Sequence, residues 1–171
     1  MSKKETKTYA MRILERMKIP YEMRTYECDE FTDGIHVADL LGISYETMYK
    51  TLVTVGKSKA YYVFVIPIAE EIDFKKAAKS VGEKSLEMLP LKELTAVTGY
   101  VRGGCTSIGM KKKFKTIIQE DAQKLDKIIV SGGKIGLQLI LLPEDLKRAA
   151  DAEYADIIPV SYTHLTLPTK A

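Results

Sequence analysis

The feature that most constrains the fold is a pair of apolar runs separated by a short polar turn. The runs TLVTVG (51–56) and YYVFVIP (61–67) are rich in β-branched and aromatic residues, which is typical of strands. The residues GKSK (56–59) lie between the runs and favour a tight turn. The sequence therefore predicts an antiparallel hairpin in the first half of the chain.

Helical and strand-like segments surround this hairpin. Helical spacing of apolar residues and capping signals predict helices over 5–17, 36–42, 44–49, 74–82, 90–99 and 143–157. Alternation predicts a strand over 21–27, and at least two of the segments 116–121, 126–133 and 136–143 are expected to be strands. Because helices and strands mix without strict βαβ alternation, we expect an α+β fold with a mixed β-sheet.

The chain is expected to form one domain over residues 1–160. Its 171 residues can bury a sizeable core, and no internal repeat or linker divides them. The last stretch, SYTHLTLPTKA (161–171), lacks a helical period and any acidic residue, so we expect a non-native or disordered tail. No apolar run is long enough to cross a membrane and no secretory signal is visible. We therefore expect a cytoplasmic protein without a membrane partner.

The content of cysteine and histidine narrows the possible chemistry. Cys28 and Cys105 make neither a zinc spacing nor a disulfide framework, and only His36 and His164 could assist them. We therefore expect no metal and no cofactor. The formal net charge of +3 is too small to indicate nucleic-acid binding by itself, and we expect no DNA partner.

A glycine-rich segment, GYVRGGCTSIGMKKKF (99–114), lies between two apolar segments. Glycine costs conformational entropy, so the backbone there needs positive φ or close approach to another group. The segment is either a surface turn or a loop whose amides face a ligand. Lysines over 111–115, like those over 75–79, are typical of solvated faces, although the first cluster directly follows the glycine loop.

No familiar catalytic motif is present. The sequence has no GxSxG elbow, no P-loop, no HExxH and no dinucleotide-binding fingerprint. Lys50, in MYKTLV, is either an edge lysine whose stem packs or a fixed cation for a phosphate or carboxylate. Ser131, in IIVSGGKIG, belongs either to a plain hairpin turn or to a pocket. The two cysteines lack the local signature of a catalytic thiol.

Four segments together resemble the YbaK/EbsC family of free-standing aminoacyl-tRNA deacylases, which are related to the editing domain of bacterial prolyl-tRNA synthetases. The segments are YEMRTYE, YKTLV, GYVRGGCTSIGMKKKF and VSGGKIGLQ, in the family's order. The resemblance spans about residues 6–158. It implies a mixed sheet curled into a partial barrel, with surrounding helices and one pocket.

The resemblance also implies roles for individual residues. Lys50 corresponds to the family's essential lysine, which makes it the expected catalytic residue. The expected substrate-binding residues are Tyr26, Thr51, Gly103, Gly104, Thr106, Ser131 and Gln138.

Two of these positions depart from the family's pattern. Thr106-Ser107 stands where the family loop usually has Ser-Pro, and Gln138 stands where the closest studied type has an aspartate. A proline would stiffen the loop, so the first departure bears on loop rigidity. The second bears on substrate preference, because an amide replaces a carboxylate.

The absence of a protein nucleophile fits the chemistry that the resemblance implies. In the cysteinyl-specific type, the thiol of the substrate attacks its own carbonyl and releases a cyclic thiolactone, so orientation supplies much of the rate. The implied function is deacylation of mischarged Cys-tRNA(Pro), with Cys-tRNA(Cys) as a further substrate. The implied partners are the acceptor end of the tRNA and prolyl-tRNA synthetase.

Two alternatives remain open at this point. The chain could be an Ala-tRNA(Pro) deacylase, whose substrate has no thiol and must use a ribose hydroxyl or water. It could also be a non-catalytic module that binds tRNA acceptor ends or a synthetase. The departures at Thr106-Ser107 and Gln138 keep the second alternative open.

Overall fold

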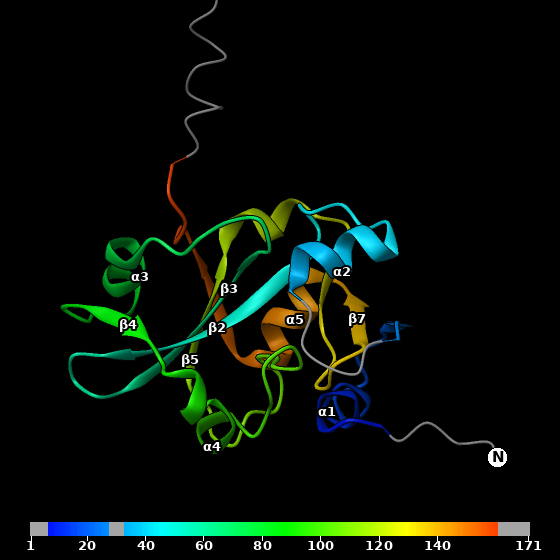
Figure 1. Cartoon of the computed structure of the whole chain (residues 1–171), viewed down its shortest axis with the longest axis horizontal. Helices are drawn as coiled ribbons and strands as arrows, with labels where there is room; N and C mark the ends of the chain where they lie inside the picture. The colour runs from blue at the N-terminus through cyan, green and yellow to red at the C-terminus, as the bar shows by residue number, and fades with distance from the viewer. Residues whose placement is uncertain (1–6, 28–32, 161–171) are drawn as a thin grey trace, which may run out of the picture.

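The structure, a computed structural model, describes residues 7–27 and 33–160. Its α-helices are α1 (Tyr9–Arg16), α2 (Gly34–Leu41), α3 (Phe74–Val81), α4 (Leu94–Thr98) and α5 (Pro143–Ala150), with short 3-10 helices η1 (Leu91–Glu93) and η2 (Glu120–Lys124). Its strands are β1 (Glu22–Thr25), β2 (Tyr49–Gly56), β3 (Tyr61–Pro67), β4 (Leu86–Met88), β5 (Lys115–Gln119), β6 (Ile128–Ser131), β7 (Leu137–Leu141) and β8 (Ala152–Ala155). Figure 1 shows the strands running through the middle of the molecule with helices around them.

The predicted hairpin is confirmed and forms the centre of the larger sheet. Strands β2 and β3 pair antiparallel from Tyr49↔Pro67 to Val55↔Tyr61. The five-stranded sheet has the order β4-β2-β3-β5-β8, in which β3, β5 and β8 are parallel neighbours. Strand β3 is buried on both faces, which accounts for its nearly continuous apolar sequence.

A smaller antiparallel sheet, in the order β1-β7-β6, completes the strands of the described chain. A single parallel bridge, Met48↔Ile129, joins the start of β2 to β6, and Ile129 donates its amide proton to the Thr47 carbonyl at 2.9 Å. The two sheets therefore meet at the beginning of β2, next to Lys50. The mixed α+β architecture agrees with the expectation, whereas closure into a partial barrel stays a prediction.

The helix ends follow local sequence chemistry. Asp73 caps α3 by accepting hydrogen bonds from the amides of Lys75 and Lys76. Gly42 ends α2 with φ +69°, a left-handed conformation that glycine adopts at low cost. Asp33 caps the same helix at its start by accepting a hydrogen bond from the His36 amide at 2.9 Å.

Two predicted helical segments are wrong. Residues 44–49 form a turn, in which the Thr47 amide donates to the Ser44 carbonyl, and then enter β2. The helix predicted over 143–157 ends at Ala150, because Asp151 adopts φ +54° and closes it. Residues 152–155 then pair with β5 as β8, so Tyr154 lies on a strand and not on a helical face. Pairing with a distant strand overrides the local helical spacing.

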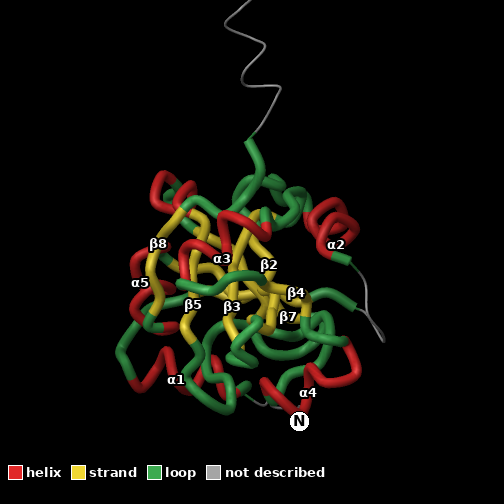
Figure 2. Tube along the Cα trace, turned by 90° about the vertical axis from the view of Figure 1, so that its left-hand side faces the viewer, coloured by secondary structure: helices red, strands yellow, loops and turns green. Residues whose placement is uncertain are grey.

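The helices pack against the sheets in groups. Helices α1 and α5 share a buried cluster with β5, β6 and β7, which includes Leu14, Leu139 and Leu146. Helix α3 covers another face of the larger sheet through Ala77 and Ala78. Figure 1 places α3 at the upper left and α1 at the lower right of the molecule, and Figure 2 shows α1 below α3.

Several expectations fall on residues that the structure does not describe. Cys28, His164 and the tail 161–171 lie outside the described residues. Among the described residues, no helix has the length and apolar character needed to cross a membrane.

Candidate functional site

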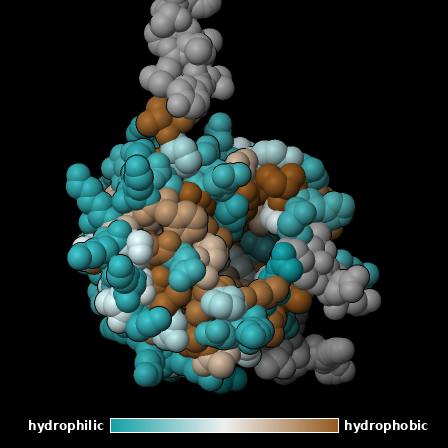
Figure 3. Space-filling model, turned by 60° about the vertical axis from the view of Figure 1, so that its left-hand side comes forward, coloured by the Kyte–Doolittle hydropathy of each residue, from teal (hydrophilic) through white to brown (hydrophobic). Residues whose placement is uncertain are grey.

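A cavity of about 630 Å³ lies where the two sheets and the glycine-rich segment come together. It is bordered by the first half of β2, the start of α2, the end of β6, the start of β7, the glycine-rich segment at Arg102, Gly103 and Cys105, and the segment from β4 to α4. Figure 3 shows a hollow on this side of the molecule, with hydrophobic and hydrophilic surface meeting at its rim. The cavity is large enough for a small-molecule ligand or one end of a larger one.

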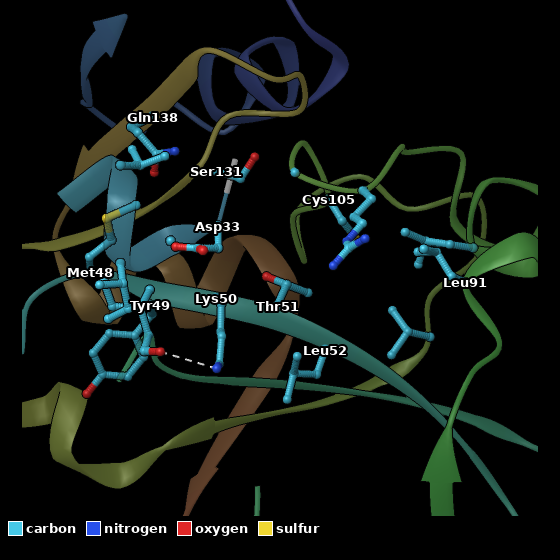
Figure 4. A pocket seen from close by; sticks show the side chains of 18 of the residues that line it. Asp33, Met48, Tyr49, Lys50, Thr51, Leu52, Leu91, Cys105, Ser131 and Gln138 are labelled. Atoms are coloured by element: carbon cyan, nitrogen blue, oxygen red, sulfur yellow. Dashed lines mark hydrogen bonds between the residues drawn. The ribbon is translucent and has the colours of Figure 1, made fainter. Parts of the chain in front are cut away.

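Strand β2 presents successive side chains to different sides. In Figure 4, Thr51 lies on the same side of β2 as Asp33, Ser131 and Cys105, whereas Lys50 extends from the opposite side. This division follows from the alternation of side chains along a strand. Lys50 and Thr51 therefore cannot act on the same atom of a ligand from the same direction, although both line the cavity.

The Lys50 ammonium lies in a half-buried position. Its Nζ donates a hydrogen bond to the carbonyl of Ile68 at 3.2 Å. Burial lowers the pKa of Lys50, and the carboxylates of Glu71 and Glu70 oppose that shift. Because the pKa of Lys50 is lowered overall, the surroundings stabilise the charged ammonium less than water does. A partly desolvated cation of this kind is a common feature of functional sites.

The glycine-rich segment and the β6–β7 hairpin meet backbone to backbone. A Cβ placed on Gly104 would come within 2.7 Å of the Lys134 Cα and 3.0 Å of its nitrogen. Gly103 adopts φ +87°, and the Gly104 amide donates to the Val101 carbonyl at 2.9 Å. That amide therefore closes a turn, and the glycines allow two loops to approach each other closely.

Six of the residues predicted from the sequence line this cavity: Tyr26, Lys50, Thr51, Gly103, Ser131 and Gln138. The remaining two, Gly104 and Thr106, are buried and do not line the cavity. Thr106 is fully buried, and its hydroxyl has no hydrogen-bond partner among the described residues. The structure thus brings together residues that are more than 100 positions apart in the sequence.

Gln138 lies on β7 directly opposite Ser131 on β6. Its side chain is 4% exposed, and its Oε1 has no hydrogen-bond partner among the described residues. A buried amide oxygen without a partner is costly unless a ligand supplies a donor. This observation favours a ligand with a hydrogen-bond donor at the hairpin end of the cavity.

Cys105 is the one cysteine of the described residues, and it lines the cavity. Burial raises the pKa of its thiol to about 12, although a hydrogen bond with Thr98 opposes the shift. At neutral pH the thiol is therefore protonated. Because the thiolate is the nucleophilic form, this cysteine is poorly suited to attack an ester.

The sequence analysis did not single out several residues of the site. Asp33 and Arg102 line the polar part of the cavity. An apolar wall comes from β4, η1, α4 and the segment between β4 and η1: Met88, Leu89, Leu91 and Leu94. The aspartate before a predicted helix could have signalled a cap, but nothing local indicates that the apolar wall lines the same cavity as Lys50 and Thr51. No group of three or more metal-ligating side chains occurs among the residues that the structure describes.

Comparisons with known proteins agree on one family. A sequence model of the aminoacyl-tRNA editing domain matches residues 33–149. A protein of Enterococcus faecalis named EbsC, a candidate Cys-tRNA(Pro)/Cys-tRNA(Cys) deacylase, is 47% identical over 160 residues, which cover 92% of this chain and 98% of the relative.

Solved structures share the α+β fold at lower sequence identity. A crystallised candidate trans-editing enzyme for prolyl-tRNA synthetase has a TM-score of 0.76 and 21% identity, with 91% of this chain and 100% of that chain covered. A crystallised hypothetical protein has a TM-score of 0.78 and 20% identity, with 86% and 97% covered. At these identities the likeness concerns the fold alone.

Proposed function

The chain belongs to the aminoacyl-tRNA editing domain family, and from that premise we propose that it deacylates mischarged Cys-tRNA(Pro). The reaction is editing in trans, in which the ester between an amino acid and the terminal ribose of the tRNA is cleaved. Cys-tRNA(Cys) is a further proposed substrate, as in the name of the 47% identical relative. The observation that carries the proposal is a cavity of suitable size in which the protein's own thiol is held protonated.

The proposed nucleophile is the thiol of the substrate. Its sulfur attacks the carbonyl carbon of the same aminoacyl group, the carbon–oxygen ester bond breaks, and the thiol proton passes to the departing ribose oxygen. The product is a cyclic thiolactone and a free tRNA end. Because the attack is intramolecular, correct orientation can supply up to roughly 7–11 kcal/mol of the barrier. Such a reaction needs a shaped cavity more than a protein nucleophile.

The residues of the cavity fit different parts of this substrate. Lys50 is proposed as the catalytic cation, which holds a terminal phosphate or orients the ester. Of the residues expected to bind the substrate, Tyr26, Thr51, Gly103, Ser131 and Gln138 are proposed to contact it, whereas Gly104 and Thr106 are proposed to act through the loop. Among them, Gln138 offers its partner-free Oε1 to the amino group of the aminoacyl moiety. Gly104 allows the glycine-rich segment to approach the Lys134 backbone, and Thr106 is buried in the same segment.

The proposed partners follow from the same assignment. The cavity accepts only the acceptor end, so prolyl-tRNA synthetase is proposed as the partner that supplies tRNA identity. We also propose that the protein acts in the cytoplasm, where its substrate is charged. The domain that carries the activity is proposed to be residues 1–160.

A deacylation assay with purified protein tests the proposal. We expect rapid release of cysteine from Cys-tRNA(Pro) and a sharp loss of rate when serine replaces cysteine on the same tRNA. Equal rates for the two would indicate water or a ribose hydroxyl as the nucleophile, as an alanyl-specific enzyme requires. No acceleration for any aminoacyl-tRNA(Pro), together with retained tRNA binding, would replace the enzyme by a non-catalytic binding module.

A further inference from the structure

A second cavity, of about 380 Å³, lies on the other side of the glycine-rich segment. It is a groove formed by α1, residues 107–116 and the end of α5. Its charged lining consists of the cations Arg16, Lys112, Lys113 and Arg148 and a single carboxylate, Asp151. We call this surface the basic groove. We propose that the basic groove binds the sugar–phosphate backbone of the substrate tRNA while the acceptor end occupies the first cavity.

The groove results from tertiary packing. Gly109 has φ +77°, and a Cβ on it would lie 2.8 Å from the Tyr9 Cδ2 and 2.9 Å from the Ile13 Cδ1. This close approach seats the segment against α1 and places the following lysines along the groove. On the other wall, Arg148 donates to the Met17 carbonyl at 3.2 Å, which ties the end of α5 to the end of α1.

Three of the four cations of the basic groove are available to a ligand, whereas Arg148 is held by the Met17 carbonyl and lies 3.9 Å from the Asp145 carboxylate. Lys113 and Asp151 approach to only 3.8 Å, and their side chains are 81% and 74% exposed, so this ion pair contributes little. Arg16 and Lys112 are exposed and have no ion-pair partner among the described residues. A concave surface with clustered cations and few carboxylates attracts polyanions such as RNA.

The position of the groove relative to the first cavity favours tRNA as the occupant. Cys105 lines the first cavity and Met110 lines the groove. Five residues of chain span at most about 18 Å, so the groove lies within reach of a tRNA whose end occupies the cavity. This inference rests on the proposed function. Contacts to phosphates position the RNA without reading its sequence, which leaves tRNA identity to the synthetase.

A pair of matched double variants tests the inference. Arg16→Gln/Lys112→Gln removes two cations of the basic groove. Lys75→Gln/Lys79→Gln removes the same charge from α3, which lies away from α1 in Figure 1 and above it in Figure 2. Arg16 and Lys79 each lie in the last turn of a helix, so the two pairs perturb helix ends similarly. The affinity for uncharged tRNA(Pro) is measured by filter binding at several salt concentrations.

We expect the groove variant to bind tRNA(Pro) on the order of tenfold more weakly, with a smaller salt dependence, while the α3 variant binds like the parent. Deacylation of a cysteinyl ester of adenosine, which reaches only the first cavity, should be unchanged in both. Affinity of the groove variant within twofold of the parent would overturn the inference, as would equal weakening in both variants. Lost association with prolyl-tRNA synthetase at unchanged tRNA affinity would assign the groove to a protein partner instead. The binding measurement does not depend on catalysis, so it tests the inference about the groove even if the parent shows no deacylation.

Discussion

At the scale of single residues, Lys50 is the proposed catalytic group, and its surroundings bear directly on that role. Its ammonium is half-buried, hydrogen-bonded to the Ile68 carbonyl, and on the opposite side of β2 from Thr51. Two roles are consistent with this position. The ammonium either braces the carbonyl at the end of the β2–β3 hairpin or leaves it to meet a phosphate or ester of the substrate.

Replacement of Lys50 separates these roles. Because the surroundings lower the pKa of Lys50, the folded state gains no net stability from the charged ammonium. We therefore expect the free energies of unfolding of Lys50→Ala and Lys50→Arg to lie within about 1 kcal/mol of that of the parent. We expect both variants to be nearly inactive. The arginine variant tests whether a planar fork can replace a point charge. Urea unfolding and the deacylation assay provide the measurements, and near-parental turnover by Lys50→Ala would remove this residue from the mechanism.

Cys105 is expected to be dispensable for catalysis. Its thiol, with a pKa raised to about 12, is protonated throughout the neutral range. We expect Cys105→Ser to keep most of the parental turnover. Its pH–rate profile, measured from about pH 6 to about pH 9, should match that of the parent. Abolished activity in this variant alone would restore a protein thiol to the centre of the mechanism.

The same thiol makes a prediction about alkaline stability. In the unfolded chain the pKa of the thiol is about 8.5, whereas burial raises it to about 12 in the folded chain. The unfolded state therefore loses its proton first, and the parent loses stability as pH rises above about 8.5, by at most about 1.4 kcal/mol per pH unit. Cys105→Ser lacks this contribution, so the difference in free energy of unfolding between parent and variant should change with pH. A constant difference from pH 7 to pH 10 would contradict the buried position of the thiol.

At the scale of elements, the contact between two loops shapes the first cavity. Gly104 abuts the backbone of Lys134, and the neighbouring residues Gly103 and Ser131 line the cavity. Any group larger than hydrogen at position 104 must push the glycine-rich segment away from the β6–β7 hairpin. Backbone atoms cannot move aside as a flexible side chain can.

Gly104→Ala is therefore expected to impair both folding and catalysis. We expect a loss of about 1–3 kcal/mol in the free energy of unfolding, as in other overpacked sites. Displacement of the cavity wall should lower turnover by on the order of 100-fold. Gly82→Ala is the matched control, because Gly82 ends α3 with φ +76° and has no atom within 4 Å of an added Cβ. The Gly82→Ala variant should lose about 1–2 kcal/mol in free energy of unfolding through backbone strain alone, and it should keep its turnover.

At the scale of the whole molecule, the segment after β8 fastens α3 to the larger sheet. The Ile157 amide donates to the Gln119 Oε1 at 2.7 Å, and its carbonyl accepts from the Asp73 amide at 2.8 Å. Lys76 donates to the Asp156 carboxylate at 2.9 Å and to the Ile158 carbonyl at 2.7 Å. The Ile157 side chain is fully buried.

Two truncations test how much of the chain the domain needs. A chain that ends after residue 160 keeps this segment, and we expect its melting temperature and turnover to match those of the full chain. A chain that ends after residue 155 loses the buried Ile157, which should cost about 2–5 kcal/mol or more. Thermal unfolding followed by circular dichroism distinguishes them. A marked loss of stability in the chain that ends after residue 160 would show that residues 161–171 belong to the domain.

The sequence by itself determined the features that depend on neighbouring residues. The hairpin of β2 and β3 follows from two β-branched runs around a turn, and the caps at Asp73 and Gly42 follow from local hydrogen bonding and glycine's access to positive φ. The family also followed from sequence, because four segments matched it in order.

Only the tertiary structure decided what depends on contacts between distant segments. β8 replaced the end of a predicted helix because β5 offered it a hydrogen-bonding edge. Strand alternation sends Lys50 and Thr51 to opposite sides of β2, but only packing brings Asp33, Ser131 and Cys105 to the side of Thr51. The basic groove gathers Arg16, Lys112 and Arg148 from three separate elements. Spacing along the chain cannot encode such meetings, because packing of whole helices and sheets fixes which surfaces face each other.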